Sequence, residues 1–214
     1  FRDIHIPEED SPASRAPAEG PAERTLLDVA VITLPHIANF DDFDPLGREQ
    51  GVGLRYVRSL RELGSPDLII LPGTKTTVDD LGSLRQEGIA ARLVELAEEG
   101  TPVIGICGGF QMLGQEVVDP AGVESTRPRT PGLGLLPVVT EFAERKETRQ
   151  VRGDVAADRG LLRGAGGLPV EGYEIHMGAT RVKGRGTGES RPAFRMSGGP
   201  GGNGQRVDGY VSPD

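Results

Sequence analysis

The sequence predicts an α/β fold in which a doubly wound, mainly parallel sheet carries helices on both faces. Four apolar segments, several of them rich in β-branched residues, are typical of buried strands and lie at 26–34, 53–59, 66–73 and 101–107. The segment 88–100 places apolar residues at three- and four-residue spacing and ends on a glycine suited to cap a helix. Strands that alternate with helices over this length indicate parallel pairing through right-handed crossovers.

Composition limits the classes of protein to consider. The chain has 214 residues, of which 36% are hydrophobic, enough for one well-formed core. The formal net charge is -8 and no stripe of Lys and Arg is present, so we expect no nucleic-acid partner. No apolar run could span a bilayer and no secretory signal is seen, so we expect a cytoplasmic chain without membrane contact.

The single cysteine, Cys107, narrows the chemistry further. One cysteine cannot form an internal disulfide or a cysteine-based metal site, and we predict no metal. A lone cysteine is most often a small buried hydrophobic residue, which is the alternative against which any catalytic role is weighed.

The chain divides into two parts. Residues 1–24 are polar and dotted with proline, which predicts a linker, whereas the apolar periodicity begins near 25 and predicts a domain over 25–214. Because the linker comes first and begins at Phe1, we expect the sequence to be a piece of a longer polypeptide.

In sheets of this kind ligands bind beyond the carboxyl ends of the strands. That rule selects "LPGTKTT", after the third strand, and "CGGFQ", after the fourth. Cys107 ends a strand and precedes Gly108, Gly109 and a short helix, the arrangement of a nucleophile elbow. A helix N-terminus favours the thiolate, and its free backbone N–H groups can hold a developing oxyanion.

The segment "GICGGFQMLG" resembles the nucleophile elbow of the class I, or triad-type, glutamine amidotransferases. Further segments resemble, in order and spacing, the C-terminal glutaminase domains of the cobyric acid synthase family. These segments are "LPHIANFDDFDPL" (34–46), "DLIILPGTKTTVDDL" (67–81), "GLGLLPV" (132–138) and "GYEIHMG" (172–178). The resemblance implies a flavodoxin-like amidotransferase fold and an enzyme that hydrolyses glutamine.

The resemblance also implies roles for individual residues. Cys107 would attack the side-chain amide of glutamine and form a thioester. The backbone N–H groups of Gly73 and Gly108 would form the oxyanion hole. Gln111 would help to seat the substrate, with a merely solvent-exposed helix position as the alternative.

The catalytic base is not assigned within the chain. In the resembled family the base is a histidine in a "TYLHG"-like segment that follows a stretch similar to "VDGYVSPD", so we expect the domain to be truncated before it and impaired as an enzyme by itself. Glu174 and His176 would line or brace the pocket, with His176 as the alternative base. His5 and His36 are expected to take no part.

The resemblance implies the partners as well. Glutamine would be the substrate, and ammonia would pass to an N-terminal synthetase domain of the same polypeptide, which would amidate corrin carboxylates. That domain would use ATP and Mg²⁺, and we expect no cofactor in this one. Three alternatives stay open: a catalytically silent docking or regulatory domain, the glutaminase subunit of an enzyme that amidates cell-wall lipid intermediates, and a cysteine hydrolase or stress-response protein of similar architecture.

Overall fold

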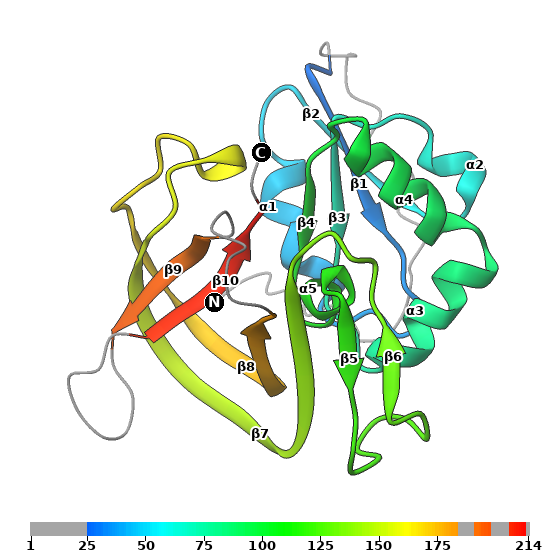
Figure 1. The fold of residues 1–214 in the computed structure, drawn as a ribbon. Coiled ribbons are helices and arrows are strands. Elements are labelled where there is room, and N and C mark those ends of the chain that lie inside the picture. The colour runs from blue at the N-terminus through cyan, green and yellow to red at the C-terminus, as the bar shows by residue number, and fades with distance from the viewer. Residues whose placement is uncertain (1–24, 184–190, 198–205, 213–214) are drawn as a thin grey trace, which may run out of the picture.

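The computed structural model describes residues 25–183, 191–197 and 206–212, and the linker predicted at 1–24 lies outside them. The first half of the described chain forms a parallel sheet of four strands (Figure 1). In spatial order these strands are β2 (Val52–Val57), β1 (Leu27–Ile32), β3 (Leu68–Leu71) and β4 (Val103–Gly105). All neighbours in this sheet pair in parallel, as the sequence predicts.

Both faces of the parallel sheet are covered. Since successive side chains of a strand point to opposite faces, Ala30 and Ile32 pack with one set of helices, while Val29 and Val31 pack with another. The first face carries α2 (Leu60–Leu63), α3 (Thr77–Gln86) and α4 (Ile89–Glu98), and the second carries η1 (Phe40–Phe43) and α1 (Asp44–Gly47). The doubly wound α/β prediction is confirmed.

Helix α4 corresponds to the segment 88–100 that the apolar spacing predicts. Its apolar stripe is buried against the sheet, with Ile89, Leu93 and Leu96 at most 1% exposed. Gly100 follows the helix with a φ of 102°, the left-handed conformation that a glycine adopts without strain at a helix end.

The second half of the chain forms another sheet, reached through α5 (Gly108–Leu113). Its strands are β5 (Glu116–Val118), β6 (Arg129–Pro131), β7 (Val138–Val155), β8 (Pro169–Val182), β9 (Arg191–Ser197) and β10 (Arg206–Val211). Only β5 and β7 pair in parallel, and the other pairs are antiparallel.

The sequence of the second half, with "GLGLLPVVTEF" (132–142) and "GYEIHMGATRV" (172–182), predicts short strands and turns. This prediction is wrong. Most of these residues belong to β7 and β8, which have 18 and 14 residues and pair along most of their length. A register shift between Glu141 and Lys146 marks an irregularity in the pairing. Bulges of this kind let a long strand bend, and Figure 1 shows β7 curving across the second sheet.

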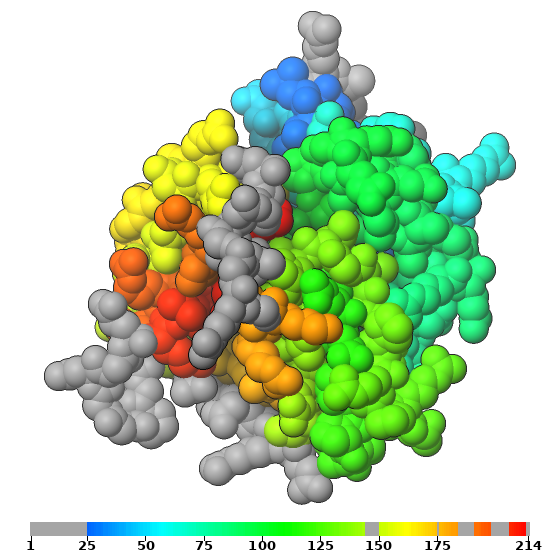
Figure 2. Space-filling view, viewed as in Figure 1, coloured from blue at the N-terminus to red at the C-terminus, as the bar shows by residue number. Residues whose placement is uncertain are grey.

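The second sheet packs against α5. The rings of Phe110 on α5 and Tyr210 on β10 stack with centroids 6.5 Å apart. Gln111 on α5 donates a hydrogen bond to the carbonyl of Met177 on β8 at 3.1 Å. Figure 2 shows the orange surface of the second half of the chain bordering a green surface near the middle of the molecule. The helix that follows Cys107 is therefore held between the two sheets.

Asp119 organises the turn that follows β5. Its carboxylate, 2% exposed, accepts hydrogen bonds from the N–H groups of Val123, Glu124 and Ser125 at 2.8 to 2.9 Å. Burial alone would raise the pKa of Asp119, but these backbone donors outweigh it and hold the pKa below its ordinary value of 3.8.

This shift predicts a pH-dependent contribution to stability. A carboxyl whose pKa is lower in the folded state stabilises the fold above its unfolded pKa, and the contribution is lost as the pH falls through the folded value. Asp119→Asn should therefore lower the free energy of unfolding by about 1–3 kcal/mol at pH 7, the usual effect of removing hydrogen bonds to a charged group. Urea unfolding at pH 7 and at pH 3 measures this. The free energies of unfolding of the variant and the wild type should differ less at pH 3 than at pH 7. If the two free energies of unfolding differed equally at both pH values, the lowered pKa of Asp119 would be contradicted.

Candidate functional site

Cys107 lies at the bend between β4 and α5. It is exposed and has a φ of 49° and a ψ of -111°, a strained conformation for a residue other than glycine. Hydrogen bonds on both sides hold the bend: the Ile106 N–H donates to the Leu71 carbonyl at 3.0 Å, and the Gln111 N–H donates to the Cys107 carbonyl at 3.0 Å. Cys107 is thus not a buried packing residue, and its backbone strain is of the kind that collects at functional sites.

The two glycines after Cys107 permit this bend. A β carbon built on Gly109 would lie 2.0 Å from the Leu71 carbonyl oxygen, and one on Gly108 would lie 2.6 Å from the Thr74 side chain. Any larger residue would push α5 away from the end of β3. The glycine pair in the sequence therefore reflects close packing of the elbow on the neighbouring strand.

Substituting Gly109 by alanine should destabilise the fold. Because the new methyl group meets backbone rather than a movable side chain, we expect a loss of about 1–3 kcal/mol or more, as for overpacked sites. Urea unfolding of the purified variant measures this. Gly82→Ala on α3 is the matched control, since a β carbon there meets nothing within 4 Å. Equal unfolding midpoints for the two variants would contradict the packing argument.

The loop after β3 brings Gly73 to Cys107, as the sequence placed them. A β carbon built on Gly73 would lie 3.5 Å from the β carbon of Cys107, so the loop after β3 touches the bend after β4. Within residues 25–183, 191–197 and 206–212, no acceptor receives the N–H of Gly73 or of Gly108. Two such donors beside a thiol suit the stabilisation of a developing negative charge, and their role as an oxyanion hole stays a prediction.

Gln111 is buried, at 7% exposure, so the alternative of a solvent-exposed helix residue is wrong. Its side-chain oxygen accepts from the Thr77 hydroxyl at 3.1 Å, and its nitrogen donates to the Met177 carbonyl at 3.1 Å. The amide thereby joins α3, α5 and β8. The predicted contact with substrate stays a prediction, and the geometry adds a bracing role beneath the elbow.

The start of α3, which carries Thr77, is supported from the turn after β5. Glu124 accepts a hydrogen bond from the Val78 N–H at 2.9 Å, in the first turn of the helix. Burial raises the pKa of Glu124, while the backbone N–H groups of Val78 and Thr77 oppose the rise. A carboxylate at this place also interacts favourably with the helix dipole.

Glu174 and His176 occupy one face of β8, two residues apart. The Glu174 side chain is 5% exposed and lies 2.6 Å from His176 Nε2, while His176 Nδ1 lies 3.0 Å from the Gly178 carbonyl oxygen. Arg206 on β10 donates to both carboxylate oxygens of Glu174. Each ring nitrogen of His176 thus faces an acceptor, and the roles of Glu174 and His176 stay predictions.

Several residues near the elbow were not found from the sequence. Arg206 follows a glycine-rich stretch, and no sequence pattern links it to Glu174. His36, which was expected to take no part, donates from its backbone N–H to Asp80 at 3.2 Å and places Nδ1 2.8 Å from the same carboxylate. A carboxylate in the first turn of α3 is the one signal that could have drawn attention to Asp80.

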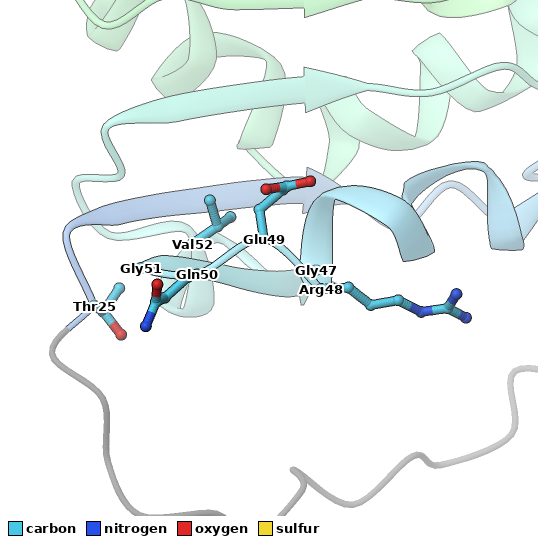
Figure 3. Close-up of a pocket in the computed structure, with 7 residues that line it drawn as sticks. All are labelled: Thr25, Gly47, Arg48, Glu49, Gln50, Gly51 and Val52. Atoms are coloured by element: carbon cyan, nitrogen blue, oxygen red, sulfur yellow. The ribbon is translucent and has the colours of Figure 1, made fainter.

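A shallow surface depression lies elsewhere on the molecule. Its lining comes from Thr25 and from the segment 47–52, which connects α1 to β2 (Figure 3). These residues precede β1 and β2, whereas Cys107 follows β4, so in a parallel sheet they lie at opposite edges. The depression is therefore no part of the Cys107 site.

Metal-binding groups and membrane-spanning helices are both absent from the described residues. Across this part of the chain, no three side chains of His, Cys, Asp or Glu are grouped so that they could hold a metal ion. None of its helices combines the length and the apolar character needed to cross a membrane.

Comparison with known proteins supplies independent information. The family model of the CobB/CobQ-like glutamine amidotransferase domain matches residues 28–214. A cobyric acid synthase of Pelotomaculum thermopropionicum is 49% identical over 210 residues, which is 98% of this chain and 39% of the relative. A cobyric acid synthase of Moorella thermoacetica is 47% identical over 195 residues, 91% of this chain and 37% of the relative. The chain thus spans about two fifths of the length of these curated relatives.

Solved structures agree at the level of the fold. The structure of PurLQS from Thermotoga maritima superposes with a TM-score of 0.62 at 20% identity, covering 87% of this chain and 82% of the other. A crystal structure of a glutamine amidotransferase gives a TM-score of 0.57 at 21% identity, covering 78% and 79%.

Proposed function

Because the chain belongs to the CobB/CobQ-like glutamine amidotransferase family, we propose that it is the glutaminase part of a cobyric acid synthase. The observation that carries the catalytic part of this proposal is the meeting of Cys107 with the Gly73 loop at the carboxyl ends of β3 and β4. The identity of 44% or more to several cobyric acid synthases supports the assignment within the family.

The reaction begins at the Cys107 sulfur. The thiolate attacks the side-chain carbonyl carbon of glutamine, a carbon–sulfur bond forms, and the carbonyl oxygen gains negative charge. The N–H groups of Gly73 and Gly108 would stabilise this oxyanion. The intermediate collapses with cleavage of the carbon–nitrogen bond, and the protonated leaving group departs as ammonia. Water then hydrolyses the glutamyl thioester and releases glutamate and the thiol.

The proton chemistry needs a base, and the described residues include two histidines. His36 lies against Asp80 and His176 lies against Glu174, each within 3 Å. A carboxylate neighbour orients a histidine and does not prevent it from acting as a base. On the family resemblance, we propose that the base is a further histidine of the full-length polypeptide, in a segment that follows a stretch similar to "VDGYVSPD". Glu174 and His176 would act by bracing the elbow from β8.

The ammonia would be consumed in another domain of the same polypeptide. There, an ATP-dependent and Mg²⁺-dependent synthetase would activate corrin side-chain carboxylates and convert them to amides. The present chain would supply the nitrogen and take no direct part in that activation, because glutamine hydrolysis by a thioester route needs neither ATP nor a metal ion.

A glutamine analogue that carries an electrophilic diazoketone tests the proposal. We expect it to modify the full-length protein at Cys107 alone, with excess glutamine protecting the thiol, and peptide mass spectrometry identifies the site. Iodoacetamide is the control reagent, because its reaction depends on thiol exposure and needs no glutamine pocket. If excess glutamine did not slow the labelling of Cys107 by the analogue, the result would favour a silent domain or another kind of cysteine protein.

A further inference from the structure

Asp80 is a buried carboxylate that the proposed reaction does not use. Its side chain is 0% exposed, yet three groups from two other segments converge on it. They are the backbone N–H of His36, the Nδ1 atom of His36 at 2.8 Å and the hydroxyl of Thr74. Burying a carboxylate is costly unless hydrogen bonds compensate it, and here these three contacts do so.

These contacts join two loops. The Ala38 N–H donates to the Gly73 carbonyl at 2.9 Å, and the Lys75 N–H donates to the His36 carbonyl at 3.0 Å. Together they form an antiparallel bridge between Ile37 and Thr74. Asp80 lies at the side of this bridge and holds His36 from one loop and Thr74 from the other.

The bridge holds the loop that contacts Cys107. It fixes the Gly73 carbonyl, and Gly73 is the residue whose missing side chain leaves room beside Cys107. The Thr74 side chain also packs where a β carbon of Gly108 would stand. The Gly73 N–H belongs to the preceding peptide and is joined to this carbonyl through the Gly73 α carbon, about which a glycine turns easily. Without the bridge, rotation about Gly73 would change the direction of its N–H and, through Thr74, the packing at Gly108.

We propose that Asp80 is a positioning residue for glutamine hydrolysis: by joining His36 to Thr74, it holds the Gly73 N–H in the direction that stabilises the oxyanion. This inference rests on the proposed function and extends it to a residue that does not touch the substrate. Because the oxyanion develops only as the thiolate attacks, the loss of this alignment should lower kcat and leave the binding of glutamine nearly unchanged.

The test uses the full-length enzyme with the substitution Asp80→Asn. Asparagine keeps the shape of the side chain but has one acceptor oxygen. It therefore removes the acceptor either from His36 Nδ1 or from the pair formed by the His36 N–H and the Thr74 hydroxyl. We expect kcat for glutamine hydrolysis to fall about 10-fold to 100-fold, within the range for a misdirected oxyanion donor, with KM within about threefold of wild type. Ammonia-dependent amidation should be unchanged.

Two further variants separate positioning from general stability. Asp119→Asn is the matched control, because it also removes a buried carboxylate that accepts backbone N–H groups, but this carboxylate contacts neither His36 nor Thr74. It should lower the unfolding temperature and leave kcat within about twofold, as expected for a site outside the catalytic machinery. His36→Arg should retain kcat within about threefold, since a guanidinium can donate to the same carboxylate.

The outcomes distinguish the positioning role of Asp80 from the proposed function itself. A folded Asp80→Asn variant with wild-type kcat, or with kcat and KM altered as in Asp119→Asn, would overturn the positioning role alone. If Asp80→Asn does not fold, Thr74→Val replaces it, because this isosteric change removes only the hydroxyl, and an unchanged kcat would likewise overturn the inference. Undiminished glutamine hydrolysis by Cys107→Ala would instead overturn the proposed function.

Discussion

Cys107→Ala in the full-length enzyme is expected to abolish glutamine hydrolysis while ammonia-dependent amidation continues. The thiol supplies the covalent step, so its removal should lower kcat by about 10⁴-fold or more, as for nucleophiles that act together with a base. Glutamate release measures the first activity, and amide formation with ammonium salt as nitrogen source measures the second.

The fold should survive this change. Cys107 is exposed and alanine requires no additional space at the bend, so the unfolding temperature should stay close to that of wild type. The backbone strain at a φ of 49° is the same in both proteins, because alanine, like cysteine, carries a β carbon. Glutamine hydrolysis at the wild-type rate would show that Cys107 has no catalytic part.

The second large effect is expected at Gly73. Substitution by valine would place a branched side chain against Cys107, because a β carbon at Gly73 stands 3.5 Å from the Cys107 β carbon. We expect kcat/KM for glutamine to fall about 100-fold to 1000-fold, comparable to the loss of one oxyanion donor. Steady-state kinetics of the full-length variant measure the effect.

A matched substitution separates this steric effect from a general response to valine. Gly82→Val, on α3, introduces the same side chain where a β carbon meets nothing within 4 Å, and it should leave kcat/KM within about twofold. Gly73→Ala should be milder than Gly73→Val, since 3.5 Å is an ordinary van der Waals contact. Full activity of Gly73→Val would exclude this glycine from the site.

The sequence by itself determined the parallel half of the fold. Strands β1 to β4 and helix α4 arise from local patterns: continuous apolar runs in the strands and a three- and four-residue apolar spacing closed by Gly100 in the helix. It also determined that Cys107 and Gly73 would meet, because residues that follow neighbouring parallel strands lie at the same edge of the sheet.

Only the tertiary structure decided the rest, because the deciding contacts join residues far apart in the chain. The lengths of β7 and β8 depend on their pairing with each other, which local apolar spacing does not encode. The burial of Gln111 depends on Met177 from β8, and the partner of Glu174 on β10 is 32 residues away. In the sequence, Asp80 is only a polar residue in the first turn of a predicted helix. Its contact with His36, 44 residues away, forms only when the two loops fold together beside the elbow. Local patterns encode strands and helices, whereas the role of a buried polar group depends on hydrogen-bond partners that only the folded chain brings to it.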